Sequence, residues 1–284
     1  MVLLQAGTAS AASRTRQATA RSYLMCPPDY FTVEYAINPW MDPGGAPVDR
    51  ALARQQWERL RQTYLDLGHT VRLIEPEPGL PDMVFAANGA TVIGGKVLGA
   101  RFRYPERAAE GKAYLDWFRR GGYPAVRDPD VINEGEGDLL YTGQAVIAGH
   151  GFRTDAAAAG ELEELFGLPV VSVRLTDPRF YHLDTALTVL DDDTAAYYPA
   201  AFTPAGREAL AGQFGTLIEA SEQDATALGL NAVSDGRHVV LPAEATGLAA
   251  QLSAAGFEPV PVEFSEFRKA GGGPKCCTLE LRGQ

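Results

Sequence analysis

Apolar residues recur at helical spacing in five separate segments of the chain, and each segment stops at a glycine. In residues 47–67, Trp57, Leu60 and Tyr64 fall on one side of a helix that stops at Gly68. Glycine suits the left-handed position that ends many helices. The other four predicted helices cover residues 105–120, 155–166, 204–214 and 243–255.

A strand-like run follows each of these glycines, and turn residues between apolar runs predict hairpins. The predicted single strands cover residues 70–74, 123–126, 170–175, 216–218 and 257–264. The predicted hairpins cover residues 90–98, 138–147, 186–197 and 232–241. The pattern therefore predicts a repeated unit of hairpin, helix and strand.

A polar residue opens each unit at a nearly constant interval. These residues are Asn38, Asn88, Asp138, Asp184 and Asn231, at intervals of 50, 50, 46 and 47 residues, and Cys276 follows 45 residues later. Equal units that each bury a face on the next predict a closed, pseudo-fivefold α/β ring. Residues 276–281 would then pair with residues 22–26 and close it. The alternative is an open α/β sheet, which does not require five matched intervals.

The equivalent end of every unit faces the axis of such a ring, so residues far apart in the sequence converge on one pocket. The residues expected there are Asn88, Glu134 or Asp138, His182, Asp184 and Cys276. Cys276 follows a glycine-rich turn at residues 271–273, and a thiol presented in this way is a candidate nucleophile.

Composition narrows the class of partner. Lys and Arg number 25 against 36 Asp and Glu, so the formal net charge is −11. This charge disfavours nucleic acids and anionic membranes as partners and is compatible with a cationic small molecule. Three cysteines cannot build a disulfide framework, which fits a reducing cytoplasm. Residues 1–20 are predicted to form a flexible tail, and residues 21–284 a single catalytic domain.

Six motifs spread over nearly the whole chain carry a resemblance. They lie at residues 25–31 with 37–41, 81–89, 134–138, 151–154, 182–185 and 271–277. In this order they resemble the guanidine-modifying branch of the pentein superfamily. That branch includes arginine deiminase, dimethylarginine dimethylaminohydrolase, arginine dihydrolase and amidinotransferase. The resemblance implies a five-bladed α/β propeller.

The resemblance also implies that Cys276 attacks a guanidinium carbon and forms a covalent S-alkylthiouronium intermediate. A thiolate is a strong nucleophile at modest pH, as this poor electrophile requires. His182 would be the general acid and base, and Glu134 would complete the triad. Cys277 competes with Cys276, although strand alternation would let only one of them face the axis. Glu136 competes with Glu134.

Further residues match substrate contacts of the family. Asp184 would share a strand face with His182 and hold two guanidinium nitrogens. Arg153 resembles a carboxylate-binding arginine, and Arg101, or alternatively Arg103, would be the second one. The remaining contacts that the resemblance implies are Asn88, Asp82 and Asn38. No metal or organic cofactor is implied, and assembly into a homo-oligomer is left open.

Asn88 departs from the pattern, because deiminases and dimethylarginine hydrolases carry an aspartate there. An asparagine amide can donate a hydrogen bond to the oxygen of a neutral ureido product, which an aspartate cannot do. This favours a dihydrolase that converts arginine to ornithine, ammonia and carbon dioxide. The alternatives are a one-step hydrolase that gives citrulline from arginine or dimethylarginine, an amidinotransferase, and a five-bladed binding protein without catalysis.

Overall fold

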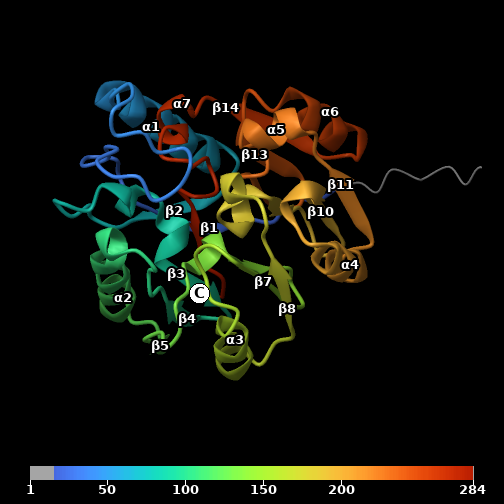
Figure 1. Ribbon diagram of the computed structural model, residues 1–284, viewed down its shortest axis with the longest axis horizontal. Helices are drawn as coiled ribbons and strands as arrows, with labels where there is room; N and C mark the ends of the chain where they lie inside the picture. Colours follow the sequence, from blue (N-terminus) through green and yellow to red (C-terminus); the bar gives the residue numbers. More distant parts are fainter. Residues whose placement is uncertain (1–15, 284) are drawn as a thin grey trace, which may run out of the picture.

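Five three-stranded sheets surround a common axis in the computed structural model, which describes residues 16–283 (Figure 1). In each sheet an antiparallel pair of strands pairs in parallel with a strand that follows a helix, and in four of the sheets the antiparallel pair is a hairpin. The helices lie outside the sheets, as Figure 1 shows. The predicted α/β ring of hairpin, helix and strand units is confirmed.

In every sheet the middle strand pairs with both of its neighbours. The sheets are β15 (Leu279–Glu280), β1 (Ser22–Met25) and β2 (Thr70–Leu73); β3 (Ala90–Ile93), β4 (Lys96–Gly99) and β5 (Ala125–Arg127); β6 (Leu139–Tyr141), β7 (Val146–His150) and β8 (Val170–Arg174); β9 (Leu187–Val189), β10 (Thr194–Tyr197) and β11 (Thr216–Glu219); and β12 (Val233–Ser234), β13 (His238–Pro242) and β14 (Glu258–Val262). The inner strands, nearest the axis, are β15, β3, β6, β9 and β12. Among these inner strands, β15 contacts β3 and β9 contacts β12.

One long helix per unit precedes the outer strand. These helices are α1 (Arg50–Asp66), α2 (Ala108–Arg120), α3 (Ala158–Phe166), α4 (Pro204–Gln213) and α6 (Thr246–Ala254). Two shorter helices, α5 (Glu222–Thr226) and α7 (Ser265–Arg268), lie in the connections of the last units. None of the helices between residues 16 and 283 is long and apolar enough to cross a membrane.

The ring closes where the end of the chain meets its beginning. β15 pairs antiparallel with β1, with Tyr23 opposite Glu280 and Leu24 opposite Leu279, as predicted. Before β1, the Thr19 amide donates to the Asp235 carbonyl. Residues 1–15 of the predicted tail lie outside the described residues.

The apolar stripe of the first predicted helix is buried: Trp57, Leu60 and Tyr64 are at most 2% exposed. The expected left-handed glycine ends this helix at Gly68, where φ is 85°. At Gly215, however, the expectation is wrong, because this glycine is not left-handed. It is constrained by space instead, since a Cβ there would lie 2.4 Å from an oxygen of the Asp193 carboxylate.

We predict that Gly89→Ala destabilises the ring. A Cβ at Gly89 would lie 2.3 Å from the ring of Tyr114, which is fully buried and whose hydroxyl donates to the Met83 carbonyl. Overpacking of this kind lowers the free energy of unfolding by about 1–3 kcal/mol, and urea denaturation measures it. Gly160→Ala in α3 is the matched control, because its Cβ meets nothing within 4 Å. Equal stability of the two variants would contradict the tight contact at Gly89.

Candidate active site

The side chains predicted to converge lie on short turns at one end of the inner strands. Asn88, Glu134 and Asp184 each lie in or directly before a 3-10 turn, ahead of β3, β6 and β9. Asn231 precedes β12, and Cys276 lies in the turn ahead of β15. The repeat therefore delivers one polar side chain per unit to the same end of the axis.

Two predictions about local conformation were wrong. His182 and Asp184 do not share a strand face, because His182 is extended and Asp184 lies in the 3-10 turn that follows. Cys276 and Cys277 lie in a turn rather than on a strand, so alternation does not separate them. Both are buried in the same apolar cluster, but the Cys276 sulfur also contacts the polar side chains of Asn231 and Asp184.

His182 lies between two carboxylates. Its Nδ1 is 3.0 Å from Asp138 Oδ2, and its Nε2 is 3.2 Å from Glu134 Oε2. The Thr154 hydroxyl donates to the same Asp138 oxygen over 2.7 Å. Burial lowers the pKa of His182, but Asp138 and Glu134 outweigh it and raise this pKa to about 9. The imidazole is therefore held as a proton donor at neutral pH.

Glu134 is fully buried, and both of its carboxylate oxygens have partners. Arg153 Nη1 donates to Glu134 Oε2 over 2.8 Å, and the Arg103 amide donates to Oε1 over 3.2 Å. The Arg153 guanidinium lies 4.8 Å from the ring centres of both Tyr104 and Tyr181. Burial opposes the ionised form of Glu134, but Arg153 and then His182 hold the pKa of this carboxyl well below its usual range. Glu134 is thus a fixed carboxylate beside His182.

The amide of Asn88 has one orientation. Arg107 Nη1 donates to Asn88 Oδ1 over 2.9 Å, and an arginine can only donate. The amide nitrogen must therefore face the other way, where it lies 3.2 Å from the Glu134 carbonyl and 3.3 Å from His182 Nε2. Asn88 presents its N–H donors to the centre of the candidate site.

Arg107 is the buried arginine beside Asn88, and sequence reasoning missed it. Its guanidinium makes two hydrogen bonds to Glu110, of 3.0 and 2.7 Å, and lies 3.9 Å from Asp82 Oδ2. Burial raises the pKa of Glu110 to about 7, and Arg107 opposes this shift. Arg101, predicted in this place, is exposed and donates to the Asp130 carbonyl instead.

Cys276 has two side-chain partners. Asn231 Nδ2 donates to its Sγ over 3.1 Å, and the Sγ lies 3.5 Å from Asp184 Oδ2. The Cys276 amide in turn donates to Asn231 Oδ1 over 2.9 Å, which fixes the Asn231 amide. Burial raises the pKa of Cys276 well above its usual value, and the neighbouring Asp184 carboxylate raises it further. The thiol form is therefore favoured until a cation enters the site.

The group is closed to solvent on the side of the β1–α1 connection. Cys276, His182 and Asn88 are at most 2% exposed. The connection is anchored over them, because Arg153 donates to the Ile37 carbonyl and Asn38 donates to the Ala270 carbonyl, each over 3.0 Å. Asn38 therefore holds the covering segment in this structure rather than facing the thiol.

The other predicted residues separate into those at the site and those beyond it. Asp82 is buried beside Arg107 and accepts from the Tyr35 hydroxyl over 2.9 Å, while its Oδ1 has no hydrogen-bond partner among the described residues. Glu136 points away from His182 and pairs with Lys275 over 2.7 Å. Residues 16–283 contain no group of three or more His, Cys, Asp or Glu arranged to hold a metal ion.

One spacing in the sequence links Arg107 to Arg153. Arg153 follows Glu134 by 19 residues, and Arg107 follows Asn88 by the same 19 residues in the preceding unit. Arg153 contacts Glu134 and Arg107 contacts Asn88, although the residue that matches Asn88 in the repeat is Asp138 rather than Glu134. Asn231 carried a similar signal, because it is the polar residue of the fifth unit at the expected interval.

We predict that His182 keeps its proton through neutral pH and that Asp138→Asn lowers its pKa, because one of the two carboxylates loses its charge. The folded pKa of about 9 exceeds the ordinary 6.5, so these contacts stabilise the fold fully below pH 6.5 and cease to do so as the pH rises through 9. Imidazole NMR titration measures the pKa, and Asp177→Asn at the surface should leave it unchanged. Loss of the proton at or below pH 6.5 in the unchanged protein would contradict this assignment.

Comparison with known proteins agrees with this arrangement. A family model described as eukaryotic N,N dimethylarginine dimethylhydrolase matches residues 28–283. The N(G),N(G)-dimethylarginine dimethylaminohydrolase of Mycobacterium tuberculosis is 58% identical over 94% of this chain and 87% of its own length. The bifunctional arginine dihydrolase/ornithine cyclodeaminase ArgZ of Synechocystis is 36% identical over 91% of this chain and 37% of its own length.

Solved structures extend the comparison to the fold. The substrate-bound N-terminal domain of cyanobacterial ArgZ, described as an arginine dihydrolase, superposes with a TM-score of 0.88 at 35% identity. That match covers 93% of this chain and 100% of the domain. The chain adopts the pentein fold and belongs to the dimethylarginine dimethylaminohydrolase family, whose members are hydrolases acting on carbon–nitrogen bonds of linear amidines.

Proposed function

We propose that this enzyme hydrolyses the guanidino group of arginine in two successive steps, with Cys276 as the nucleophile. The observation that carries the proposal is the fixed amide of Asn88, which directs its N–H donors toward the centre of the site. A guanidinium needs acceptors around it, whereas a ureido oxygen needs a donor. Asn88 can serve that oxygen, so the product of a first hydrolysis stays bound for a second.

The first step uses three groups. The Cys276 sulfur attacks the guanidinium carbon and forms a carbon–sulfur bond, while His182 gives a proton to the departing nitrogen, which leaves as ammonia. Glu134 stabilises the imidazolium before the transfer, since its Oε2 lies 3.2 Å from Nε2. Water then attacks the thiouronium carbon, His182 takes a proton from that water, and the carbon–sulfur bond breaks to release the ureido product.

The second step repeats the same chemistry on the ureido carbon: a second ammonia leaves, water breaks the carbon–sulfur bond, and the resulting carbamate then loses carbon dioxide as its bond to the ornithine nitrogen breaks. Asn88 donates to the ureido oxygen, and this draws electron density from the carbon that Cys276 attacks. The overall change consumes one arginine and two water molecules and gives ornithine, two ammonia molecules and carbon dioxide.

Recognition of an α-amino acid is assigned to two buried arginines. Arg153 and Arg107 each carry a planar guanidinium that can pair with an α-carboxylate. Asp82 Oδ1, which has no partner among the described residues, is suited to an α-ammonium group. Asp184, buried beside the thiol, supplies a carboxylate for the cationic guanidinium. This set selects arginine over a bare alkylguanidine.

Hydrolysis of dimethylarginine to citrulline and dimethylamine is the second candidate. The observation that favours it is the 58% identity to the mycobacterial protein of that name, which exceeds the 36% identity to ArgZ. Cys276 and His182 would then carry out a single hydrolysis. Asn88 would contact the substrate, but citrulline would leave before Cys276 could attack it.

We predict ornithine as the end product from arginine, detected by mass spectrometry of reaction mixtures containing arginine, citrulline or dimethylarginine. Asn88→Asp removes the N–H donor to the ureido oxygen, so citrulline should accumulate. Ornithine formation should fall at least about 10-fold, which is the effect expected from the loss of one hydrogen bond. Cys276→Ala should abolish turnover of every substrate, whereas Cys277→Ala is the matched control and should retain it.

Two outcomes would contradict the proposal at different levels. Release of dimethylamine without consumption of citrulline would replace the two-step assignment by the second candidate. Unchanged turnover in Cys276→Ala would remove the nucleophile assignment itself, whatever the substrate.

A further inference from the structure

A cavity of about 110 Å³ lies on the ring axis beyond the candidate site. The inner strands run from the site residues to this cavity, because Asp184 precedes β9 and Thr188 in β9 lines the cavity, as do Thr142 after β6 and Ser234 at the end of β12. The volume is sufficient for several water molecules, which need about 10–15 Å³ each on this measure. The cavity is separate from the β1–α1 connection that covers the site.

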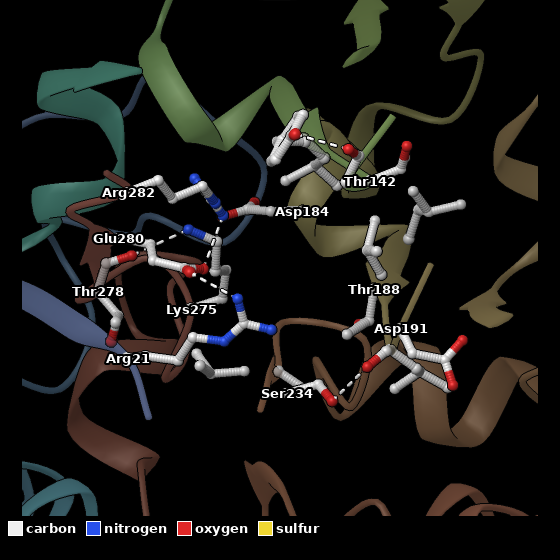
Figure 2. Close-up of a pocket in the computed structure, with 18 of the residues that line it drawn as sticks. Arg21, Thr142, Asp184, Thr188, Asp191, Ser234, Lys275, Thr278, Glu280 and Arg282 are labelled. Carbon is white, nitrogen blue, oxygen red and sulfur yellow. Dashed lines mark hydrogen bonds and ion pairs between the residues drawn. The ribbon is translucent and has the colours of Figure 1, made fainter. Parts of the chain in front are cut away.

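Asp184 joins the site to this cavity. Its Oδ2 lies 3.5 Å from Cys276 Sγ, and Asp184 is also among the residues that line the cavity (Figure 2). The side chain is 1% exposed, and its Oδ1 has no hydrogen-bond partner among the described residues. A buried carboxylate oxygen without a partner is costly unless water or a ligand satisfies it. One carboxylate therefore contacts the thiol and borders the axial cavity.

The other neighbours of the thiol cannot take its proton. Asn231 Nδ2 is a donor toward the sulfur, so it stabilises a thiolate but accepts nothing. His182 already holds a proton between Asp138 and Glu134. The β1–α1 connection closes the opposite side. Asp184 is left as the base in contact with the sulfur.

We propose that Asp184 accepts the proton of the Cys276 thiol and passes it to water in the axial cavity, so that the nucleophile is activated from the far end of the ring. This inference rests on the proposed role of Cys276 and deepens it. The substrate side of the site can then stay closed while the proton leaves. His182 keeps its own proton for the departing nitrogen.

The transfer balances without another reactant. The sulfur–hydrogen bond breaks, its electron pair stays on sulfur, and the proton bonds to Asp184 Oδ2. A half turn of the carboxyl group about the Cβ–Cγ bond brings this proton to the cavity side, where water accepts it and the carboxylate is restored. When the product leaves, the thiolate regains a proton by the reverse path.

The charges around Asp184 suit a group that gains and loses a proton. His182 and Lys275 favour its carboxylate, while burial and Asp138 oppose it, and the balance raises the pKa of Asp184 to about 6. Several other charged residues that line the cavity have ion-pair partners. Arg282 and Lys275 pair with Glu136, and Arg21 pairs with Glu280.

A matched pair of variants at Thr188 tests the route. Thr188 lines the cavity, and its hydroxyl donates to the Leu230 carbonyl. Thr188→Val keeps the size of the side chain, whereas Thr188→Met extends into the cavity and displaces water. Rapid-quench measurement of thiouronium formation with arginine, in ordinary and in heavy water, gives the rate and the solvent isotope effect.

We expect Thr188→Met to slow thiouronium formation at least about 10-fold, as part of the roughly 100- to 10,000-fold that one proton-transfer group contributes, with KM unchanged and a larger solvent isotope effect. Thr188→Val should have the same rate of thiouronium formation, the same KM and the same solvent isotope effect as the unchanged enzyme. Asp184→Asn should slow the same step and also raise KM, because it loses a carboxylate that contacts the cationic substrate. A defect of packing alone would leave the isotope effect unaltered.

The outcomes separate this inference from the proposed function. If Thr188→Met matches Thr188→Val in rate and isotope effect while Cys276→Ala is inactive, the proton route is overturned and the nucleophile stands. If Cys276→Ala stays active, the proposed function fails first. Should Thr188→Met not fold, Ser234→Leu against Ser234→Ala fills the same cavity from β12 and decides the question in the same way.

Discussion

Closure of the ring is the constraint on which the chemistry depends. Cys276 lies almost at the end of the chain, and pairing of β15 with β1 fixes this end against the first unit. The cysteine turn is then held from both sides, since the Ala87 amide donates to the Cys276 carbonyl over 3.0 Å and the Lys275 amide donates to the Asn231 carbonyl over 3.2 Å. The sulfur thereby reaches Asp184, which comes from a different unit.

The second determinant is the matching of buried charges. Burial of an ionised group is unfavourable unless a partner compensates it, and several groups of the site satisfy this condition. Glu134 has Arg153 and His182, and Arg107 has Glu110. These ion pairs and hydrogen bonds do more than stabilise the fold, because they also determine which groups donate hydrogen bonds. The carboxylates keep the His182 imidazole protonated, and Arg107 fixes the orientation of the Asn88 amide. The role of each group as a hydrogen-bond donor or acceptor thus follows from its buried ion-pair and hydrogen-bond partners.

The ring and the convergence of its polar residues could be read from the sequence, because equal intervals leave few closed arrangements. The local details could not. The expectation that His182 and Asp184 share a strand face failed because a 3-10 turn begins between them. The prediction named Arg101, or alternatively Arg103, and missed Arg107, because the sequence shows charge but not burial. The available signal was a spacing of 19 residues, which separates Arg107 from Asn88 and Arg153 from Glu134.

The central claim is that Cys276 becomes covalently attached to the guanidino carbon. The most direct measurement is mass spectrometry of the intact protein and of its C-terminal peptide after acid quenching within milliseconds of mixing with arginine. The account predicts a thiouronium adduct on the peptide that contains Cys276, located on that residue by fragmentation. An adduct on Cys277, or turnover without any adduct on this peptide, would contradict it.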